Sequence, residues 1–154
     1  MSPKPEPSVV ALVASAGGVR ALGAVVSRLP ASLDAAVVIV LHLARERRSL
    51  LAEILDRTSA LPVHEAREGE PVEAGNVYVA PPDAHLVVRD GSIVLDHSAP
   101  VRFLRPSADM LLESLAAAYG DRCVAVILSG TGSDGAAGAA AIRAAGGTVI
   151  AQTS

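Results

Sequence analysis

Three short apolar runs constrain the fold of this chain more than any other feature of its sequence. They are VVALVA at residues 9–14, AVVIVL at 36–41 and CVAVIL at 123–128. Runs of this length, without alternating polar residues, are typical of strands buried on both faces of a parallel sheet. Such strands need helices on both sides, so the runs predict a three-layer α/β/α arrangement with right-handed crossovers.

Segments with helical spacing separate these runs. In residues 19–29 the apolar side chains recur every three or four positions, and Pro30 ends the helix expected there. Further helices are expected over residues 48–58, over MLLESLAAAY with Ser107 as its N-cap, and over an Ala-rich stretch to about Ala145. The segment TVIAQ, which follows a pair of glycines, is predicted to be the last strand.

Four short β-like segments occupy the middle of the chain, at residues 62–66, 76–80, 84–88 and 92–96. The dipeptide Asp90-Gly91 between the last two is a hairpin signal. We expect antiparallel or mixed strands here that extend the sheet. The predicted fold class is therefore α/β, with a mainly parallel sheet and an antiparallel β-hairpin extension.

Size and charge narrow the domain organisation and the class of partner. The 154 residues fit one domain, expected over residues 9–154 after a disordered Pro-rich tail at 1–8. The net charge of −3 argues against a general nucleic-acid binder, which would present a basic face. We see no targeting signal, and no apolar stretch approaches the roughly 20 residues that span a bilayer. We therefore expect a soluble, cytoplasmic protein without membrane insertion.

A hydroxyl, an imidazole and a carboxylate follow the three apolar runs. Ser15 comes directly after the first run, His42 directly after the second, and Asp134 lies in the loop after the third. Ligands of open parallel sheets bind outside the carboxyl ends of the strands. We therefore expect the three side chains to meet there as a catalytic triad, with Ser15 as nucleophile, His42 as base and Asp134 as the group that orients His42.

Backbone N–H groups beside these residues are candidates for an oxyanion hole. Glycines after Ser15 allow a tight turn from strand to helix and expose N–H groups at a helix N-terminus. The candidate donors are the backbone N–H groups of Ala16, Gly17 and Thr131. They would stabilise negative charge that develops on a carbonyl oxygen.

Other interpretations of the same residues remain open. Ser15 is also compatible with a phosphate loop or a simple turn, His42 with a hydrogen-bonded core histidine, and Asp134 with a cap on the helix that follows it. His85, at a strand start, is a candidate to line the cleft, whereas His64 and His97 are expected at the surface. No metal site is predicted, because no histidines or acids show metal-ligand spacing. Three arginines after His42, at positions 45, 47 and 48, suggest a solvated turn or a docking site for an acidic surface.

Five ordered motifs carry a resemblance to a known family. They are VASAGGVRAL, VVIVLHL, LPVHEAREGEPVEAGNVYVAPPDAHLVV, RPSADMLLESLA and AVILSGTGSDGAAG. Over residues 9–154 the chain resembles the catalytic domain of the chemotaxis receptor methylesterases (CheB-type). The last motif is the most specific, being similar to the family's G-x-G-x-D-G loop.

The resemblance implies a doubly wound, Rossmann-like sheet and a triad that falls on Ser15, His42 and Asp134. It implies hydrolysis of glutamate γ-methyl esters on chemoreceptor signalling helices, with release of methanol and in some members deamidation of glutamine. No cofactor is expected. The implied partners are the methylated cytoplasmic helices of chemoreceptors and a separate response regulator or kinase.

Departures from the family pattern leave two alternatives open. Many members have Thr at the position of Ala16 and Met at that of Thr131, continue beyond the position of Ser154, and carry an N-terminal receiver domain. The changes at Ala16 and Thr131 and the end of the sequence at Ser154 motivate a non-catalytic or weakly active signalling module of the same fold as the alternative function. A nucleotide-binding domain is less favoured, because the chain lacks G-x-G-x-x-G and a Walker lysine.

Overall fold

The three apolar runs form neighbouring strands of one parallel sheet in the computed structural model, which describes residues 8–42, 50–101, 104–128 and 134–152. The six-stranded sheet has the order β3-β4-β2-β1-β7-β8. Its strands are β1 (Ser8–Ala14), β2 (Ala35–Leu41), β3 (Val63–Glu65), β4 (Val77–Val79), β7 (Cys123–Leu128) and β8 (Thr148–Ala151).

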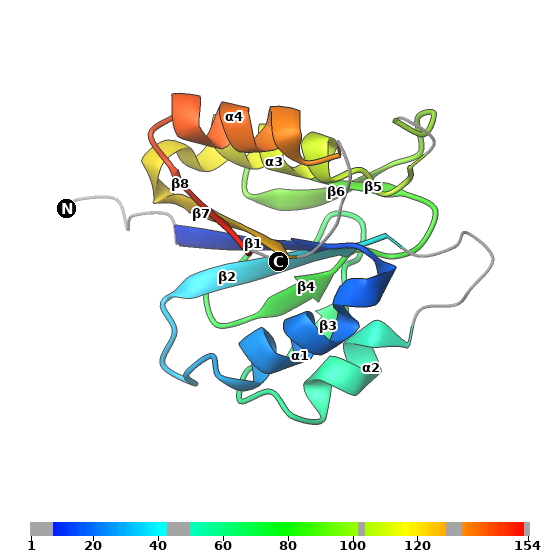
Figure 1. Ribbon diagram of the computed structural model, residues 1–154, viewed down its shortest axis with the longest axis vertical. Coiled ribbons are helices and arrows are strands. Elements are labelled where there is room, and N and C mark those ends of the chain that lie inside the picture. Colours follow the sequence, from blue (N-terminus) through cyan, green and yellow to red (C-terminus); the bar gives the residue numbers. More distant parts are fainter. Residues whose placement is uncertain (1–7, 43–49, 102–103, 129–133, 153–154) are drawn as a thin grey trace.

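Helices cover both faces of this sheet, as Figure 1 shows. One face carries α1 (Val19–Ser27) and α2 (Leu51–Asp56), and the other carries α3 (Ala108–Tyr119) and α4 (Ala136–Ala144). Three short elements complete the described chain: the 3₁₀ helices Ala16–Gly18 and Gly120–Arg122, and the hairpin of β5 (His85–Arg89) and β6 (Ser92–Asp96). The predicted α/β class with a mainly parallel sheet is confirmed.

The central strands are apolar throughout because both of their faces are covered. Every residue of β2 is buried. Alternate side chains of a strand point to opposite faces, so Val38 belongs to the core under α3 and α4, whereas Ile39 belongs to the core under α1 and α2. β1 divides in the same way, with Val13 in the first core and Leu12 in the second.

The four middle segments divide between two sheets. β3 and β4 join the main sheet as parallel strands, so the expected extension of the sheet is found there, though not in antiparallel form. β5 and β6 instead form a separate antiparallel sheet beside α3. Their apolar residues, among them Leu86 and Ile93, share a core with Leu111 of α3. Burial against a helix, and not sheet pairing, therefore places the hairpin.

The order of the strands creates a switch point at the centre of the sheet. From β1 the chain passes through α1 to β2 on one side, whereas β7 lies on the other side of β1 and leads to β8. Loops at the carboxyl ends of β1 and β7 therefore diverge toward opposite faces, which is where open α/β sheets bind their ligands.

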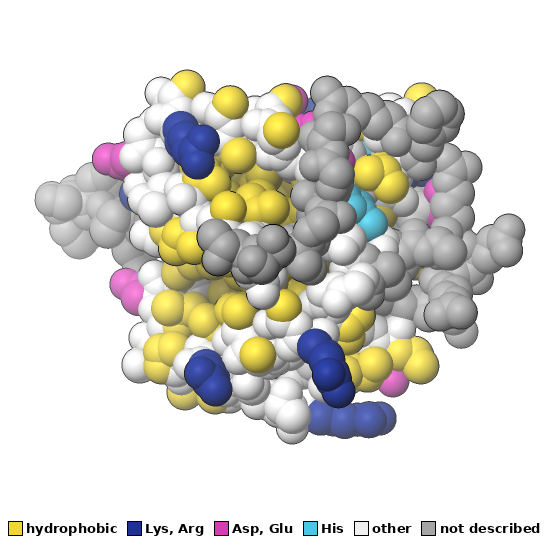
Figure 2. Space-filling model, viewed as in Figure 1, with side chains coloured by type: hydrophobic (Ala, Val, Ile, Leu, Met, Phe, Trp, Pro, Cys, Tyr) yellow, Lys and Arg dark blue, Asp and Glu magenta, His cyan; other side chains and the backbone are white. Residues whose placement is uncertain are grey.

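The outer strand β8 forms an edge of the sheet. Ile150 of this strand is 52% exposed. Figure 2 shows hydrophobic side chains between the two helical layers on the viewed face.

Among the described residues, no helix is both long and apolar enough to cross a membrane.

Close contact between α3 and α4 depends on Gly138. A Cβ atom at this position would lie 2.6 Å from Cβ of Leu112 and 3.2 Å from Cα of Asp109. We expect Gly138→Ala to lower the free energy of unfolding by about 2 kcal/mol, because the two helices must separate. Urea unfolding checks this, with Gly23→Ala in α1 as control. A Cβ at Gly23 meets no atom within 4 Å, so the control should be neutral or stabilising; equal effects would contradict the packing argument.

Candidate active site

The strand ends that carry Ser15 and His42 lie next to each other. The parallel strands β1 and β2 pair as far as Ala14 and Leu41, and the next residues are Ser15 and His42. The His42 backbone N–H donates to the Ala14 carbonyl at 3.0 Å. Ser15 keeps an extended backbone, with φ −82° and ψ 172°, before the chain turns into the 3₁₀ helix. Because neighbouring strands are about 4.8 Å apart, both residues leave the sheet at the same place.

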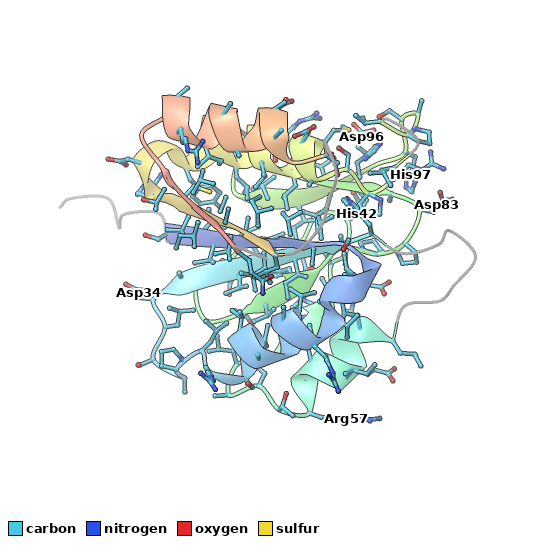
Figure 3. The ribbon with its side chains drawn as sticks, viewed as in Figure 1. Asp34, His42, Arg57, Asp83, Asp96 and His97 are labelled. Atoms are coloured by element: carbon cyan, nitrogen blue, oxygen red, sulfur yellow. The ribbon has the colours of Figure 1, made fainter. Side chains whose placement is uncertain are left out.

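The imidazole of His42 contacts the carboxylate of Asp134. His42 Nε2 lies 2.7 Å from Asp134 Oδ2, and the two side chains are 10% and 1% exposed. Asp134 follows β7, which pairs with β1 on the side away from β2. Figure 3 shows His42 at the end of the sheet opposite Asp34, which precedes β2. An imidazole that follows β2 and a carboxylate that follows β7 thus meet at the carboxyl end of the sheet.

Both oxygens of Asp134 accept further hydrogen bonds. Oδ1 accepts from the Ser107 hydroxyl at 2.9 Å and from the Asp109 backbone N–H at 3.1 Å, and Oδ2 accepts from the Ala108 N–H at 2.7 Å. Burial alone raises the pKa of this carboxyl. The hydrogen bonds from His42, the two N–H groups and Ser107 outweigh burial and lower the pKa to about 2. Asp134 is therefore an anion at neutral pH, and the ring nitrogen that faces it carries a proton.

This lowered pKa predicts a pH dependence of stability. Between about pH 4 and pH 2 the unfolded chain binds the Asp134 proton more readily than the folded chain, so stability falls as the pH is lowered. The contribution is about 2 kcal/mol, fully present above pH 4. We expect the difference in unfolding free energy between the parent and Asp134→Asn to be larger at pH 6 than at pH 2 by this amount. Urea titrations at both values measure it, and an unchanged difference would contradict the prediction.

Asp134 and Asp109 each accept hydrogen bonds from the start of a helix, Asp134 from α3 and Asp109 from α4. Asp134 accepts from the first N–H groups of α3. Asp109, in the first turn of α3, accepts through Oδ1 from the N–H groups of Gly135 at 2.9 Å and Gly138 at 2.7 Å, at the start of α4. The N-cap of α4 is Gly135. Asp134 therefore does not cap the helix that follows it, which was one of the open interpretations, but the helix that precedes it.

Ser107 and His85 support the same carboxylate. Ser107 is the N-cap of α3, as predicted, since its hydroxyl oxygen accepts from the Met110 N–H at 3.4 Å. Its backbone N–H donates to Nδ1 of His85 at 3.0 Å. His85 is fully buried, so the expectation that it lines a cleft is wrong. The Ser107 cap was predictable from the sequence, but its contact with Asp134 was not, because the only local signal is a set of polar residues at a helix start.

The remaining candidate residues lie partly within and partly outside the described residues. His64 is half-buried, and its Nε2 atom lies 2.9 Å from Oε2 of Glu70. His97 is exposed. Within the part of the chain that the structure describes, no cluster of His, Cys, Asp and Glu could hold a metal ion. Of the predicted oxyanion donors, Ala16 and Gly17 belong to the 3₁₀ helix directly after Ser15. Thr131 and the arginines at positions 45, 47 and 48 lie outside the described residues.

Known proteins resemble this chain over nearly its whole length. A sequence model of the CheB methylesterase family matches residues 10–154. The chain is 45% identical over 147 residues to protein-glutamate methylesterase/protein-glutamine glutaminase 4 of Myxococcus xanthus, covering 95% of this chain and 42% of that protein. It is 45% identical over 145 residues to the protein-glutamate methylesterase/protein-glutamine glutaminase of Symbiobacterium thermophilum, covering 94% and 40%. The chain thus spans about two fifths of the length of these relatives.

A solved structure has the same fold. The catalytic domain of the Thermotoga maritima CheB methylesterase superposes with a TM-score of 0.88 at 38% sequence identity, covering 94% of this chain and 79% of that domain. The superposition therefore includes nearly the whole of this chain. On the match of the family model and of these relatives, this chain belongs to the CheB methylesterase family.

Proposed function

We propose that this chain is a serine esterase that hydrolyses γ-methyl esters of glutamate residues on chemotaxis receptors. One observation carries the proposal: the His42 ring, 2.7 Å from the buried Asp134 carboxylate, directly follows β2, and Ser15 directly follows the neighbouring strand β1. A base oriented by a carboxylate and placed beside a serine is the arrangement that activates a hydroxyl nucleophile. The names of the relatives supply the substrate class.

The proposed proton transfers follow from the orientation of the His42 ring. Because His42 Nε2 faces Asp134, Nδ1 is the ring nitrogen that takes the proton from Ser15 as its Oγ attacks the ester carbonyl. The imidazolium, stabilised by the Asp134 anion, then returns the proton to the departing methoxide, and methanol leaves. Water then attacks the acyl-enzyme. His42 takes the proton from the water and returns it to Ser15 Oγ, and the glutamate side chain is released. With a glutamine substrate the leaving group is ammonia.

Backbone N–H groups near Ser15 are the proposed donors to the tetrahedral intermediate. Ala16 and Gly17 open the 3₁₀ helix after Ser15, and α1 follows at once, so N–H groups of a helix start lie beside the nucleophile. Thr131 would supply a third donor from the loop after β7. Removal of one such donor typically costs about 100-fold to 1,000-fold in kcat.

The proposed substrate determines the proposed partners. Methylated glutamates lie on the cytoplasmic helices of chemoreceptors, so we place the reaction in the cytoplasm. Regulation would come from a separate response regulator or kinase.

The test is release of methanol from methylated receptor. Purified chain is mixed with receptor fragments methylated at glutamate, and methanol is measured against time. Unmethylated receptor is the control, and ammonia release from it reports glutamine deamidation. Methanol released in proportion to enzyme concentration supports the proposal. A chain that is folded by circular dichroism but releases methanol neither from receptor nor from a small methyl ester would contradict it and favour the non-catalytic module.

A further inference from the structure

His85 is a fully buried histidine whose two ring nitrogens both have backbone partners. The Ser107 N–H donates to Nδ1 at 3.0 Å, and Nε2 lies 3.0 Å from the carbonyl oxygen of Ala99. A backbone N–H only donates and a carbonyl oxygen only accepts. The ring must therefore carry its proton on Nε2 and none on Nδ1, so His85 is a neutral imidazole of a single tautomer.

The contact to Ser107 belongs to a larger set at the start of α3. Three successive backbone N–H groups, those of residues 107, 108 and 109, donate to two side chains. The first donates to His85, and the next two donate to Asp134. The Ser107 hydroxyl also donates to Asp134, at 2.9 Å. The His85 ring thus binds the first N–H group of residues 107–109, and the other two N–H groups bind the Asp134 carboxylate.

We infer that His85 is a positioning residue, which orients the Asp134–His42 pair by holding the backbone of Ser107. The inference rests on the proposed function for the use of that pair in catalysis, whereas the contacts exist independently of any reaction. The connection runs from Nδ1 of His85 to Ser107, from Ser107 to Asp134, and from Asp134 to Nε2 of His42 at 2.7 Å. His85 acts through these groups and not on the substrate.

His85 holds its two backbone partners through an acceptor, Nδ1, and a donor, the Nε2–H group. His85→Phe keeps a buried ring but removes both groups, so the Ser107 N–H loses its acceptor inside the core. We expect kcat for ester hydrolysis to fall by up to about 100-fold, because small displacements of catalytic groups have effects of that size. KM should change little, since substrate contacts remain. His85→Gln, which offers one acceptor and one donor, should restore most of kcat.

Nuclear magnetic resonance of ¹⁵N-histidine-labelled chain gives a readout that a loss of general stability would not imitate. In the parent, the proton shared by His42 and Asp134 should give a low-field resonance, assigned by its absence in His42→Gln. The nitrogen shifts of His85 should report the Nε2–H tautomer. The low-field resonance should weaken or move in folded His85→Phe. It should be unchanged in the matched control His97→Phe, whose side chain is exposed.

The outcomes separate this inference from the proposed function. A folded His85→Phe variant with the parent's resonance and kcat would overturn the inference and leave the esterase intact. If that variant does not fold, the parent spectrum decides, because a proton on Nδ1 of His85 excludes the Ser107 contact and overturns the inference. If the parent releases no methanol but loses the His42–Asp134 resonance on substitution of His85, positioning is supported and the esterase proposal fails.

Discussion

Replacement of Ser15 by Ala is expected to lower kcat for methyl-ester hydrolysis by about a million-fold, to the level of the remaining polar site. The substitution removes the only atom that could form the acyl-enzyme in the proposed mechanism. His42 and Asp134 keep their contact, because it joins β2 to the loop after β7 and does not involve Ser15. Methanol release from methylated receptor measures the effect, and KM should be nearly unchanged.

Ser27→Ala is the matched control for this substitution. Ser27 is an exposed serine near the end of α1, and its hydroxyl donates to the Ala24 carbonyl at 3.0 Å. This variant should retain the kcat of the parent. Retention of more than about a hundredth of the parent kcat by folded Ser15→Ala would show that another group attacks the ester, because general-base help to water does not replace a nucleophile so well.

Replacement of Asp134 by Asn should have the second-largest effect, a loss of about 10,000-fold in kcat, as expected when a triad carboxylate becomes an amide. The four donors that face Asp134 come from His42, Ser107, Ala108 and Asp109. An amide offers one accepting oxygen and turns its own N–H₂ group toward a donor. The imidazole then either turns or adopts the other tautomer, so that Nδ1 no longer accepts the Ser15 proton.

The same substitution should also lower the free energy of unfolding by about 3 kcal/mol, since buried donors lose their acceptors. Kinetics and urea unfolding therefore have to be measured on the same preparation, at a temperature where the variant is fully folded. Asp34→Asn, at an exposed position before β2 and at the opposite end of the strand from His42, is the control. A folded Asp134→Asn variant within tenfold of the parent kcat would argue against a catalytic role of the His42–Asp134 contact.

Much of the architecture was predictable from local sequence. The runs that became β1, β2 and β7 are apolar at every position, which happens when both faces of a strand are covered. Ser107 was predictable as a cap, because a hydroxyl before an apolar helical segment is a local signal. The placement of the β5–β6 hairpin was not, because its short apolar segments look the same in the sequence whether the hairpin joins the main sheet or packs on α3.

The placement of Ser15, His42 and Asp134 after three buried strands was determined by the sequence alone. A strand end is marked where an apolar run stops, and the ends of parallel strands gather at one edge of the sheet. Only the tertiary structure decided what holds these groups. Ala108 and Asp134 are 26 positions apart, and His85 and Ser107 are 22 positions apart. No periodicity or turn signal spans such separations. The first contact exists only once α3 and α4 have packed with their starts side by side, and the second only once β5 has packed against α3.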